Sequence, residues 1–185
     1  QIVESSETCA LETIGAKFVR EVRPGEMIII TKKGIASKQL AKAKPRLDIF
    51  EFVYFARYDS ILAGKSVYQV RKNLGKMLAR EHKIKVDMVI PVPETAISAA
   101  LGYAEESGIP FEMAISKNRY INRTFIEPTQ NVREEKVKLK LTPLVNIIRG
   151  KRIAVMDDSI VRGTTSKQIV KMLFEAGAKE VHFLV

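Results

Sequence analysis

Strand-like runs of apolar residues recur through the second half of the chain. Residues 86–92 and 153–156 are nearly continuous apolar stretches of strand length, as is typical of parallel strands that are covered on both faces. Pro91 and Pro93 stop the first run from continuing, because proline cannot donate to a sheet ladder. Residues 180–185 begin a third strand.

Amphipathic helices are predicted between and after these strands. Apolar residues recur at helical spacing over 67–82, with Lys and Arg on the other face, and again over 166–176. A third helix follows the strand at 86–92 and ends at Gly108, since glycine is common just past a helix end. In chain order, the residues expected to face inward are Val67, Val70, Leu74, Met77 and Leu78, then Ile97, Ala100, Leu101 and Ala104, then Ile169, Val170, Leu173 and Phe174.

The alternation of buried strands and amphipathic helices predicts an α/β fold. Such a pattern indicates a mainly parallel sheet with flanking helices, joined by right-handed crossovers. Ligands of these sheets bind beyond the carboxyl ends of the strands. The residues that directly follow 86–92 and 153–156 are therefore the first place to look for chemistry.

The first 45 residues have a different pattern. Short strands are predicted over 17–22 and 27–31, separated by a turn, and Gly34 closes a hairpin. The stretch 38–46 is basic and weakly patterned, and we interpret it as a linker. We therefore predict two domains, 1–45 and 46–185, and expect the chain to be a segment of a longer protein with its second domain truncated.

Composition and charge narrow the possible partners. A chain of 185 residues with 46% apolar content can bury one sizeable core. No run is long enough to span a membrane and the start lacks a signal-peptide pattern, so we expect a cytoplasmic protein without a membrane partner. The single Cys9 allows neither an internal disulfide nor a thiolate metal site, and a small buried residue is expected there.

The net charge of +10 favours anionic partners. The basic residues are dispersed, without a continuous tract or an aromatic-rich strand on which bases could stack. Phosphorylated small molecules are therefore favoured over nucleic acid, and we expect no nucleic-acid partner.

The segment 154–166 combines several features that suit a phosphorylated ligand. It runs from a strand through Asp157 and Asp158 to Gly163 and into a helix. Two adjacent carboxylates repel each other unless a cation or hydroxyl donors face them. Gly163 permits close approach of the backbone, and the N–H groups of the following helix start attract an anion. The alternative is that the two acids only cap the helix, although one acid would suffice for that.

Two further segments carry candidate groups. The junction 90–96 places Glu94 and Thr95 after a strand, where either could simply be a helix N-cap. The stretch 116–126 is rich in basic residues, and a solvated loop is its plain interpretation.

These three segments resemble the glutamine amidophosphoribosyltransferase family of type I phosphoribosyltransferases. The run Asp-Asp-Ser-Ile-Val-Arg-Gly-Thr-Thr at 157–165 is similar to the family's phosphoribosyl pyrophosphate motif. The junction 90–96 resembles its pyrophosphate loop, with Ala96 where a serine is common, and 116–126 resembles its mobile loop, with Asn122 where glycine is common. Residues 1–45 resemble the β-rich tail of an N-terminal-nucleophile glutaminase domain, whose nucleophilic cysteine is not in this chain.

The resemblance implies a role for each matched residue. Asp157, Asp158 and Thr95 would surround a Mg²⁺ ion, and the two acids would also hold the ribose hydroxyls. Of the implied catalytic residues, Lys117, Arg119 and Arg123 would neutralise the departing pyrophosphate and Tyr120 would cover the site. The remaining implied substrate-binding residues are Glu94, Ser159, Arg162, Gly163, Thr164, Thr165 and Ser166.

The implied activity is transfer of glutamine-derived ammonia onto phosphoribosyl pyrophosphate. The products would be pyrophosphate and 5-phosphoribosylamine, in the first step of de novo purine nucleotide synthesis. Purine nucleotides are then expected as feedback inhibitors, and a homo-oligomer is expected. Two alternatives stay open: a base-salvage phosphoribosyltransferase, and a regulatory protein that senses phosphoribosyl pyrophosphate and binds DNA.

Overall fold

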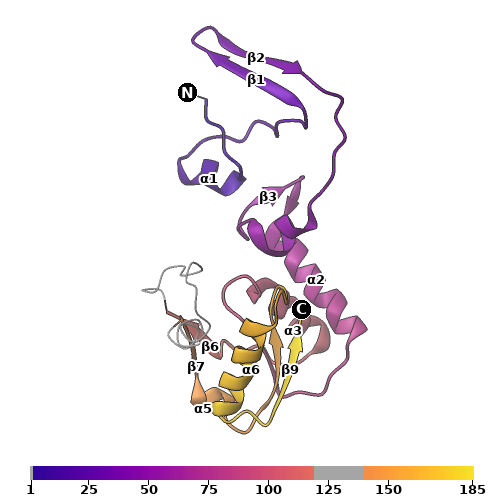
Figure 1. The fold of residues 1–185 in the computed structure, drawn as a ribbon, viewed down its shortest axis with the longest axis vertical. Helices are drawn as coiled ribbons and strands as arrows, with labels where there is room; N and C mark the ends of the chain where they lie inside the picture. The colour runs from indigo at the N-terminus through magenta and orange to yellow at the C-terminus, as the bar shows by residue number, and fades with distance from the viewer. Residues whose placement is uncertain (1, 119–139) are drawn as a thin grey trace. The chain divides into compact units, whose positions relative to one another are not determined.

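The computed structural model describes residues 2–118 and 140–185, which form two compact units, Gln1–Val67 and Tyr68–Val185 (Figure 1). The first unit has little regular structure. Its elements are helix α1 (Thr8–Thr13), strands β1 (Glu26–Thr31) and β2 (Gly34–Gln39), π-helix η1 (Glu51–Phe55), and strands β3 (Ile61–Leu62) and β4 (Lys65–Ser66).

The hairpin predicted in the first unit is confirmed. Strands β1 and β2 pair antiparallel, with Thr31 opposite Gly34 across the turn. The strand predicted over 17–22 is wrong, because that stretch is irregular and pairs with no other strand. Alternation of side chains does not make a strand unless a neighbour accepts its backbone hydrogen bonds. Cys9 is buried, as expected.

The second unit contains most of the regular structure. Helix α2 (Val67–Glu81) begins at the last residue of the first unit. The elements that follow are β5 (Met88–Pro91), α3 (Ile97–Ser107), β6 (Ile115–Lys117), β7 (Leu141–Pro143), α5 (Val145–Ile148), β8 (Arg152–Met156), α6 (Thr164–Glu175) and β9 (Glu180–Leu184). The structure confirms the predicted buried strands and the three main helices. It also confirms the helix end at Gly108, which has the left-handed conformation with φ 71°.

A parallel sheet forms the core of the second unit. Its strand order is β5-β8-β9, and both neighbouring pairs are parallel. Ile153 and Val155 belong to a hydrophobic cluster with α6, whereas Ala154 and Met156 belong to a second cluster with α3. Successive residues of a strand point to opposite faces, so α6 and α3 cover the two faces of the sheet (Figure 1). The predicted α/β class is confirmed.

Helices α2 and α3 pack through glycines. A Cβ atom built on Gly75 would lie 1.9 Å from the carbonyl oxygen of Ala99, and one built on Gly102 would lie 1.9 Å from that of Lys72. Neither position can hold a larger side chain without moving a helix, because such a contact is far inside van der Waals distance. Ion pairs Lys76–Glu105 at 3.1 Å and Arg80–Glu106 at 2.8 Å also join the two helices.

The predicted inward faces of α2, α3 and α6 need correction, and in α6 the misplaced residue is Phe174, which is 50% exposed. In α2 the buried positions follow a spacing of four and are Val67, Arg71, Gly75 and Ala79. Leu74 and Met77 are 40% and 53% exposed, although both were expected to face inward. In α3, Ala100 and Ala104 are buried as predicted, but Ile97 and Leu101 are only half-buried. The backbones of α2 and α3 come close together at Gly75 and Gly102, so the helices contact each other through faces that carry small residues. The largest apolar side chains lie beside this contact.

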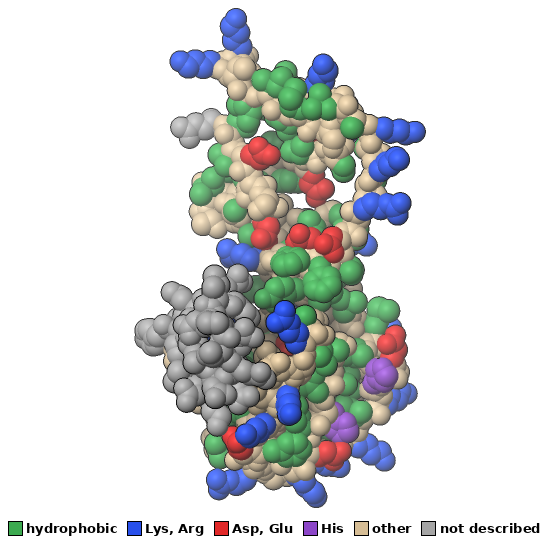
Figure 2. Space-filling model, in the orientation of Figure 1, with side chains coloured by type: hydrophobic (Ala, Val, Ile, Leu, Met, Phe, Trp, Pro, Cys, Tyr) green, Lys and Arg blue, Asp and Glu red, His purple; other side chains and the backbone are tan. Residues whose placement is uncertain are grey.

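The described residues contain no helix with the length and hydropathy that a membrane span requires. Lys and Arg side chains are scattered over the face visible in Figure 2, among apolar and acidic ones.

Candidate active site

Two loops leave the same edge of the sheet. Strands β5 and β8 are parallel neighbours, and Pro91 lies opposite Met156 at their carboxyl ends. The N–H group of Val92 donates to the carbonyl oxygen of Met156 at 2.8 Å, which keeps the two chains together one residue further. The loops that begin at residues 92 and 157 therefore start side by side, as the topology of a parallel sheet requires.

Thr95 and Asp158 meet between these loops. The Thr95 hydroxyl donates a hydrogen bond to Oδ2 of Asp158. The Ser159 hydroxyl donates to Oδ1 of the same carboxylate at 2.7 Å. Both oxygens of Asp158 are thus held in place by hydroxyl groups, and the carboxylate has a fixed orientation at the strand ends.

None of the candidate residues Glu94, Thr95, Asp157 and Asp158 acts as a helix cap. The N-cap residue of α3 is Ala96 and that of α6 is Gly163, and no side chain caps either helix start. The alternatives that Thr95 or Glu94 caps α3, and that the two acids cap α6, therefore fail.

Asp157, like Asp158, is half-buried, and its contacts are to the backbone. Its N–H donates to the carbonyl oxygen of Leu184 at 2.9 Å, and its Oδ1 accepts from the N–H of Asp158 at 2.9 Å. Burial raises the pKa of the Asp157 carboxyl to about 6. The hydrogen bond from the N–H of Asp158 lowers this pKa somewhat, and the negative charge of Asp158 raises it further. An ionised Asp157 is thus poorly compensated here, and such a carboxylate favours a cation or hydroxyl donors beside it.

The start of α6 presents backbone donors. Gly163 has φ 70° in the left-handed region, where glycine carries no penalty, and the helix begins at Thr164. The Ser166 hydroxyl donates to the carbonyl oxygen of Gly163 at 3.1 Å. Thr164 and Thr165 are exposed, so their N–H groups and hydroxyls are accessible to an anion.

Charged side chains lie near the same edge. Glu94 follows the cis peptide bond at Pro93, and its Oε2 lies 3.6 Å from the ammonium nitrogen of Lys117, the last residue of β6. Arg162 is exposed in the loop before α6. The other predicted catalytic residues, Arg119, Tyr120 and Arg123, lie outside the described residues.

The pairing of Glu94 with Lys117 is a feature that the sequence reasoning missed. Glu94 was expected after a strand, as the structure has it, but Lys117 was expected in a solvated loop and instead ends strand β6. Their contact depends on which non-adjacent strands end near each other, and the sequence pattern did not predict a strand at 115–117.

A magnesium ion fits the donor set of this site. The described residues contain no group of three His, Cys, Asp or Glu side chains that could hold a metal on their own. Asp157, Asp158 and Thr95 nevertheless supply carboxylate and hydroxyl oxygens. Mg²⁺ is typically bound through one or two carboxylates together with substrate phosphates and water. These residues therefore suit an ion that arrives with a phosphorylated substrate.

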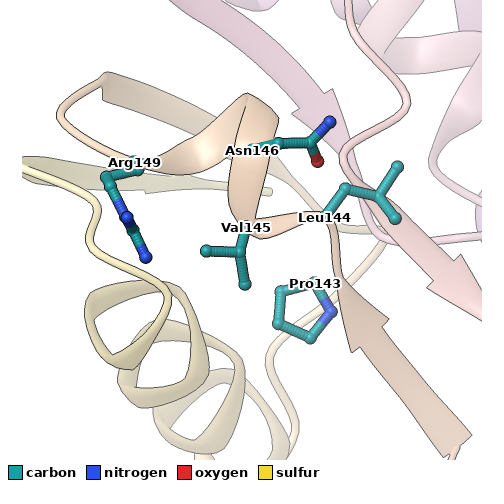
Figure 3. Close-up of a pocket in the computed structure, with 5 residues that line it drawn as sticks. All are labelled: Pro143, Leu144, Val145, Asn146 and Arg149. Carbon is teal, nitrogen blue, oxygen red and sulfur yellow. The ribbon is translucent and has the colours of Figure 1, made fainter.

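A shallow hollow lies elsewhere, around the start of α5 (Figure 3). It is lined by Pro143, Leu144, Val145, Asn146 and Arg149. None of these residues belongs to the predicted site.

Comparison with known proteins identifies the family. The phosphoribosyl transferase domain matches residues 57–185, which is more than half of the chain. The chain belongs to the phosphoribosyl transferase domain family. The match includes both loops at the carboxyl edge of the sheet and the helix that starts at Thr164.

Relatives within the family share about half of the residues. The amidophosphoribosyltransferase of Synechococcus elongatus is 51% identical over 99% of this chain, and that of Bacillus subtilis is 51% identical over 97%. These alignments cover 37% and 38% of the two relatives, so the chain spans well under half of their length.

Solved structures agree with this family membership. The glutamine phosphoribosylpyrophosphate amidotransferase from B. subtilis, solved as a complex with ADP and GMP, superposes with a TM-score of 0.87. It is 50% identical, and the superposition covers 97% of this chain and 40% of that one. A structure described as the allosteric regulatory enzyme of purine biosynthesis also has a TM-score of 0.87, with 51% identity.

Proposed function

We propose that this chain performs the phosphoribosyl-transfer half of an amidophosphoribosyltransferase reaction. In this reaction ammonia displaces pyrophosphate from phosphoribosyl pyrophosphate and 5-phosphoribosylamine is formed. The observation that carries the proposal is the junction of two strand ends, where Thr95 bonds Asp158 beside the glycine-led start of α6. Amidophosphoribosyltransferases that are 51% identical over nearly the whole chain support the choice of reaction.

Each part of the site has one task in this proposal. The open N–H groups at Thr164 and Thr165 bind the 5′-phosphate, because the helix dipole favours an anion there. Ser166 and Gly163 hold the turn that presents them. The carboxylate oxygens of Asp157 and Asp158 accept hydrogen bonds from the ribose hydroxyls. Together these contacts fix the sugar, which brings C1 and the incoming nitrogen into reacting distance.

The chemical step is displacement at C1 of the ribose. The lone pair of ammonia forms the C1–N bond while the C1–O bond to pyrophosphate breaks, and the leaving group takes the electron pair. The attacking nitrogen then loses a proton to solvent. Ammonia is already a nucleophile, so the site needs no strong general base, and its main task is to neutralise the leaving group.

Lys117 is the described cation best placed for that task. The Lys117 ammonium lies near Glu94, and Glu94 is on the loop that we assign to pyrophosphate. Lys117 can therefore exchange the Glu94 carboxylate for a phosphate oxygen of the substrate. Arg119, Tyr120 and Arg123 are proposed to assist from the loop that follows. A magnesium ion bound between Thr95, Asp157 and Asp158 would supply further positive charge to the pyrophosphate.

The wider setting of the reaction is also a proposal. Ammonia would come from glutamine, released by a glutaminase part of the protein that carries the nucleophilic cysteine. Purine nucleotides are proposed as feedback inhibitors, by analogy with the B. subtilis relative that was solved with ADP and GMP. We also propose that the protein is cytoplasmic, acts as a homo-oligomer and catalyses the first step of purine synthesis.

Calorimetry with magnesium and phosphoribosyl pyrophosphate tests the binding part. We expect saturable binding to the wild-type protein and loss of binding in a variant that carries both Asp157→Asn and Asp158→Asn. Steady-state release of pyrophosphate then tests the reaction, with ammonia, purine bases and pyrimidine bases as acceptors. Turnover with ammonia alone supports the proposal. Turnover with a purine or pyrimidine base would point instead to a salvage enzyme, and DNA binding without turnover would point to a regulator.

A further inference from the structure

One buried polar atom in the second unit has no hydrogen-bond partner. The side-chain amide nitrogen of Gln168, in α6, is buried and bonds to none of the described residues. In the described part of the chain, no other buried side-chain nitrogen or oxygen lacks a partner. A buried N–H group without an acceptor costs free energy, and native structures contain few of them. A ligand that brings an acceptor to this amide would remove the cost.

Gln168 lies on one face of α6 together with Thr164 and Met172. Residues four positions apart are neighbours on the same face of an α-helix, so the three side chains follow one another along its axis. Met172 is 7% exposed and belongs to the core, Gln168 is half-buried, and Thr164 is exposed at the helix start. This row of side chains runs from the core to the open end of the helix, and Gln168 occupies the boundary.

The side chain of Gln168 extends toward the first turn of α6. A helical side chain leans toward the helix N-terminus and covers the turn that precedes its own Cα atom. For Gln168 this turn is 164–167, about 5.4 Å along the axis. It carries the N–H groups of Thr164 and Thr165, which we assign to the 5′-phosphate. The amide can move toward them without breaking a hydrogen bond, because it makes none with the described residues.

The start of α6 is a place of donors and not of acceptors. The carbonyl oxygen of Gly163 already accepts from the N–H of Lys167 at 2.9 Å and from the Ser166 hydroxyl at 3.1 Å. The first N–H groups of a helix have no intrahelical acceptor, whereas the carbonyl groups of the first turn bond within the helix. Gln168 therefore adds a donor where donors already dominate, and a single anion can satisfy all of them.

We infer that Gln168 is a further substrate-binding residue, whose Nε2 donates a hydrogen bond to the phosphate that binds at the start of α6. This inference rests on the proposed function, which places the 5′-phosphate of phosphoribosyl pyrophosphate there. A phosphate group offers several strong acceptor oxygens. One oxygen can accept from Gln168 while the others accept from the N–H groups of Thr164 and Thr165.

Calorimetry with phosphoribosyl pyrophosphate and magnesium tests the role of the amide in the full-length protein. Gln168→Met keeps the length of the side chain and removes the donor, and Gln168→Glu replaces the donor by a negative charge. We expect the affinity to fall roughly tenfold in Gln168→Met, because a hydrogen bond to a charged group is lost. It should fall further in Gln168→Glu, since a carboxylate repels phosphate. In steady-state assays with ammonia, the KM for phosphoribosyl pyrophosphate should rise in Gln168→Met while kcat stays within about twofold.

Thermal unfolding of the same proteins, measured without ligand, gives the second readout. Methionine puts no polar atom into the buried position, so Gln168→Met should raise the unfolding midpoint by roughly 2 °C or more. A residue that only supports the fold would show the opposite change, since its removal lowers stability. Weaker ligand binding together with higher stability therefore identifies a binding residue.

A matched variant makes the same chemical change elsewhere in the second unit. Gln69 is exposed in α2, and its amide nitrogen donates to Oδ1 of Asn73 at 3.0 Å. In Gln69→Met the affinity for phosphoribosyl pyrophosphate should stay within about twofold of the wild-type value, and the unfolding midpoint should not rise, because the amide that is lost already has a partner at the surface.

The outcomes separate the role of Gln168 from the proposed function. Weaker binding in Gln168→Met, with a midpoint at or above that of the wild-type protein, supports the inference. Unchanged binding overturns it and leaves the proposed function standing. A lowered midpoint, or a failure of the variant to fold, also overturns it, because the amide then already has a partner in the folded protein. If the wild-type protein itself does not bind phosphoribosyl pyrophosphate with magnesium, the proposed function fails and the role of Gln168 fails with it.

Discussion

Substitution of Asp157 by Asn should stabilise the unliganded protein at neutral pH. Burial raises the pKa of this carboxyl from 3.8 to about 6, so the folded state holds the proton more tightly than the unfolded chain. A carboxyl whose pKa is raised on folding contributes stability that is fully present below pH 3.8 and is lost as pH rises through about 6. Above that range the ionised Asp157 opposes folding, and Asn removes the charge.

The size of the effect follows from the pKa. A rise of this size corresponds to about 3 kcal/mol if none of the interaction is screened. Asp157 is only half-buried, and solvent screening reduces the expected gain to about 1–2 kcal/mol at pH 7.5. At pH 3.5, where the folded wild-type carboxyl is protonated and the unfolded one is mostly protonated, the two proteins should have nearly equal stability.

Urea denaturation, followed by circular dichroism at several pH values, measures this difference. Asp158→Asn is the comparison, because both oxygens of Asp158 already accept hydrogen bonds from hydroxyl groups. That variant turns one acceptor into a donor and should lose about 1–2 kcal/mol at neutral pH. If Asp157→Asn gains nothing at pH 7.5, or if its gain is the same at pH 3.5, burial does not raise the pKa of Asp157 and the reasoning is wrong.

Three further substitutions probe the rest of the second unit. Gly102→Ala should lower the free energy of unfolding by about 2 kcal/mol or more, since its Cβ would lie 1.9 Å from a carbonyl oxygen of α2, and urea denaturation measures the loss. Glu94→Gln should raise the affinity for inorganic pyrophosphate roughly two- to fivefold, because a partly exposed ion pair no longer holds Lys117, and calorimetry measures this affinity. A lower affinity would mean that Glu94 itself contacts the ligand. The hydrogen bonds from Arg152 lower the pKa of Asp87 to about 2, so Asp87→Asn should lower the urea midpoint at pH 7, and the gap to wild type should narrow as pH falls from 3.8 toward 2.

The sequence predicted the sheet and the place of the site because both follow from local pattern. Buried apolar runs identify strands, and parallel strands bring their carboxyl ends to one edge. The residues after 86–92 and 153–156 were therefore expected at the edge of the sheet where ligands bind. The contact between Thr95 and Asp158, which are 63 positions apart, meets that expectation.

The contacts between helices were not predictable in the same way. Hydrophobic periodicity ranks Leu74 and Met77 above Gly75, although Gly75 makes the close contact with α3. A glycine contributes nothing to an apolar pattern, and its value here is the absence of a Cβ atom. The hydrogen bonds that Glu7, Thr8 and Glu21 accept from backbone N–H groups 42 to 53 residues away were also not predictable, because such side-chain acceptors leave no periodic signal.

The candidate site combines two features that one kind of ligand would satisfy together. Asp157 is an acid whose charge is poorly compensated, and the first turn of α6 presents N–H groups that attract an anion. A divalent cation alone would compensate the charge of Asp157 and leave the N–H groups of α6 without a partner. Inorganic phosphate alone would bind those N–H groups, leave Asp157 uncompensated and add negative charge near Asp157 and Asp158. A phosphorylated sugar that carries magnesium on its pyrophosphate satisfies both at once. On the proposed function, magnesium and phosphoribosyl pyrophosphate should therefore bind cooperatively, each with higher affinity when the other is present.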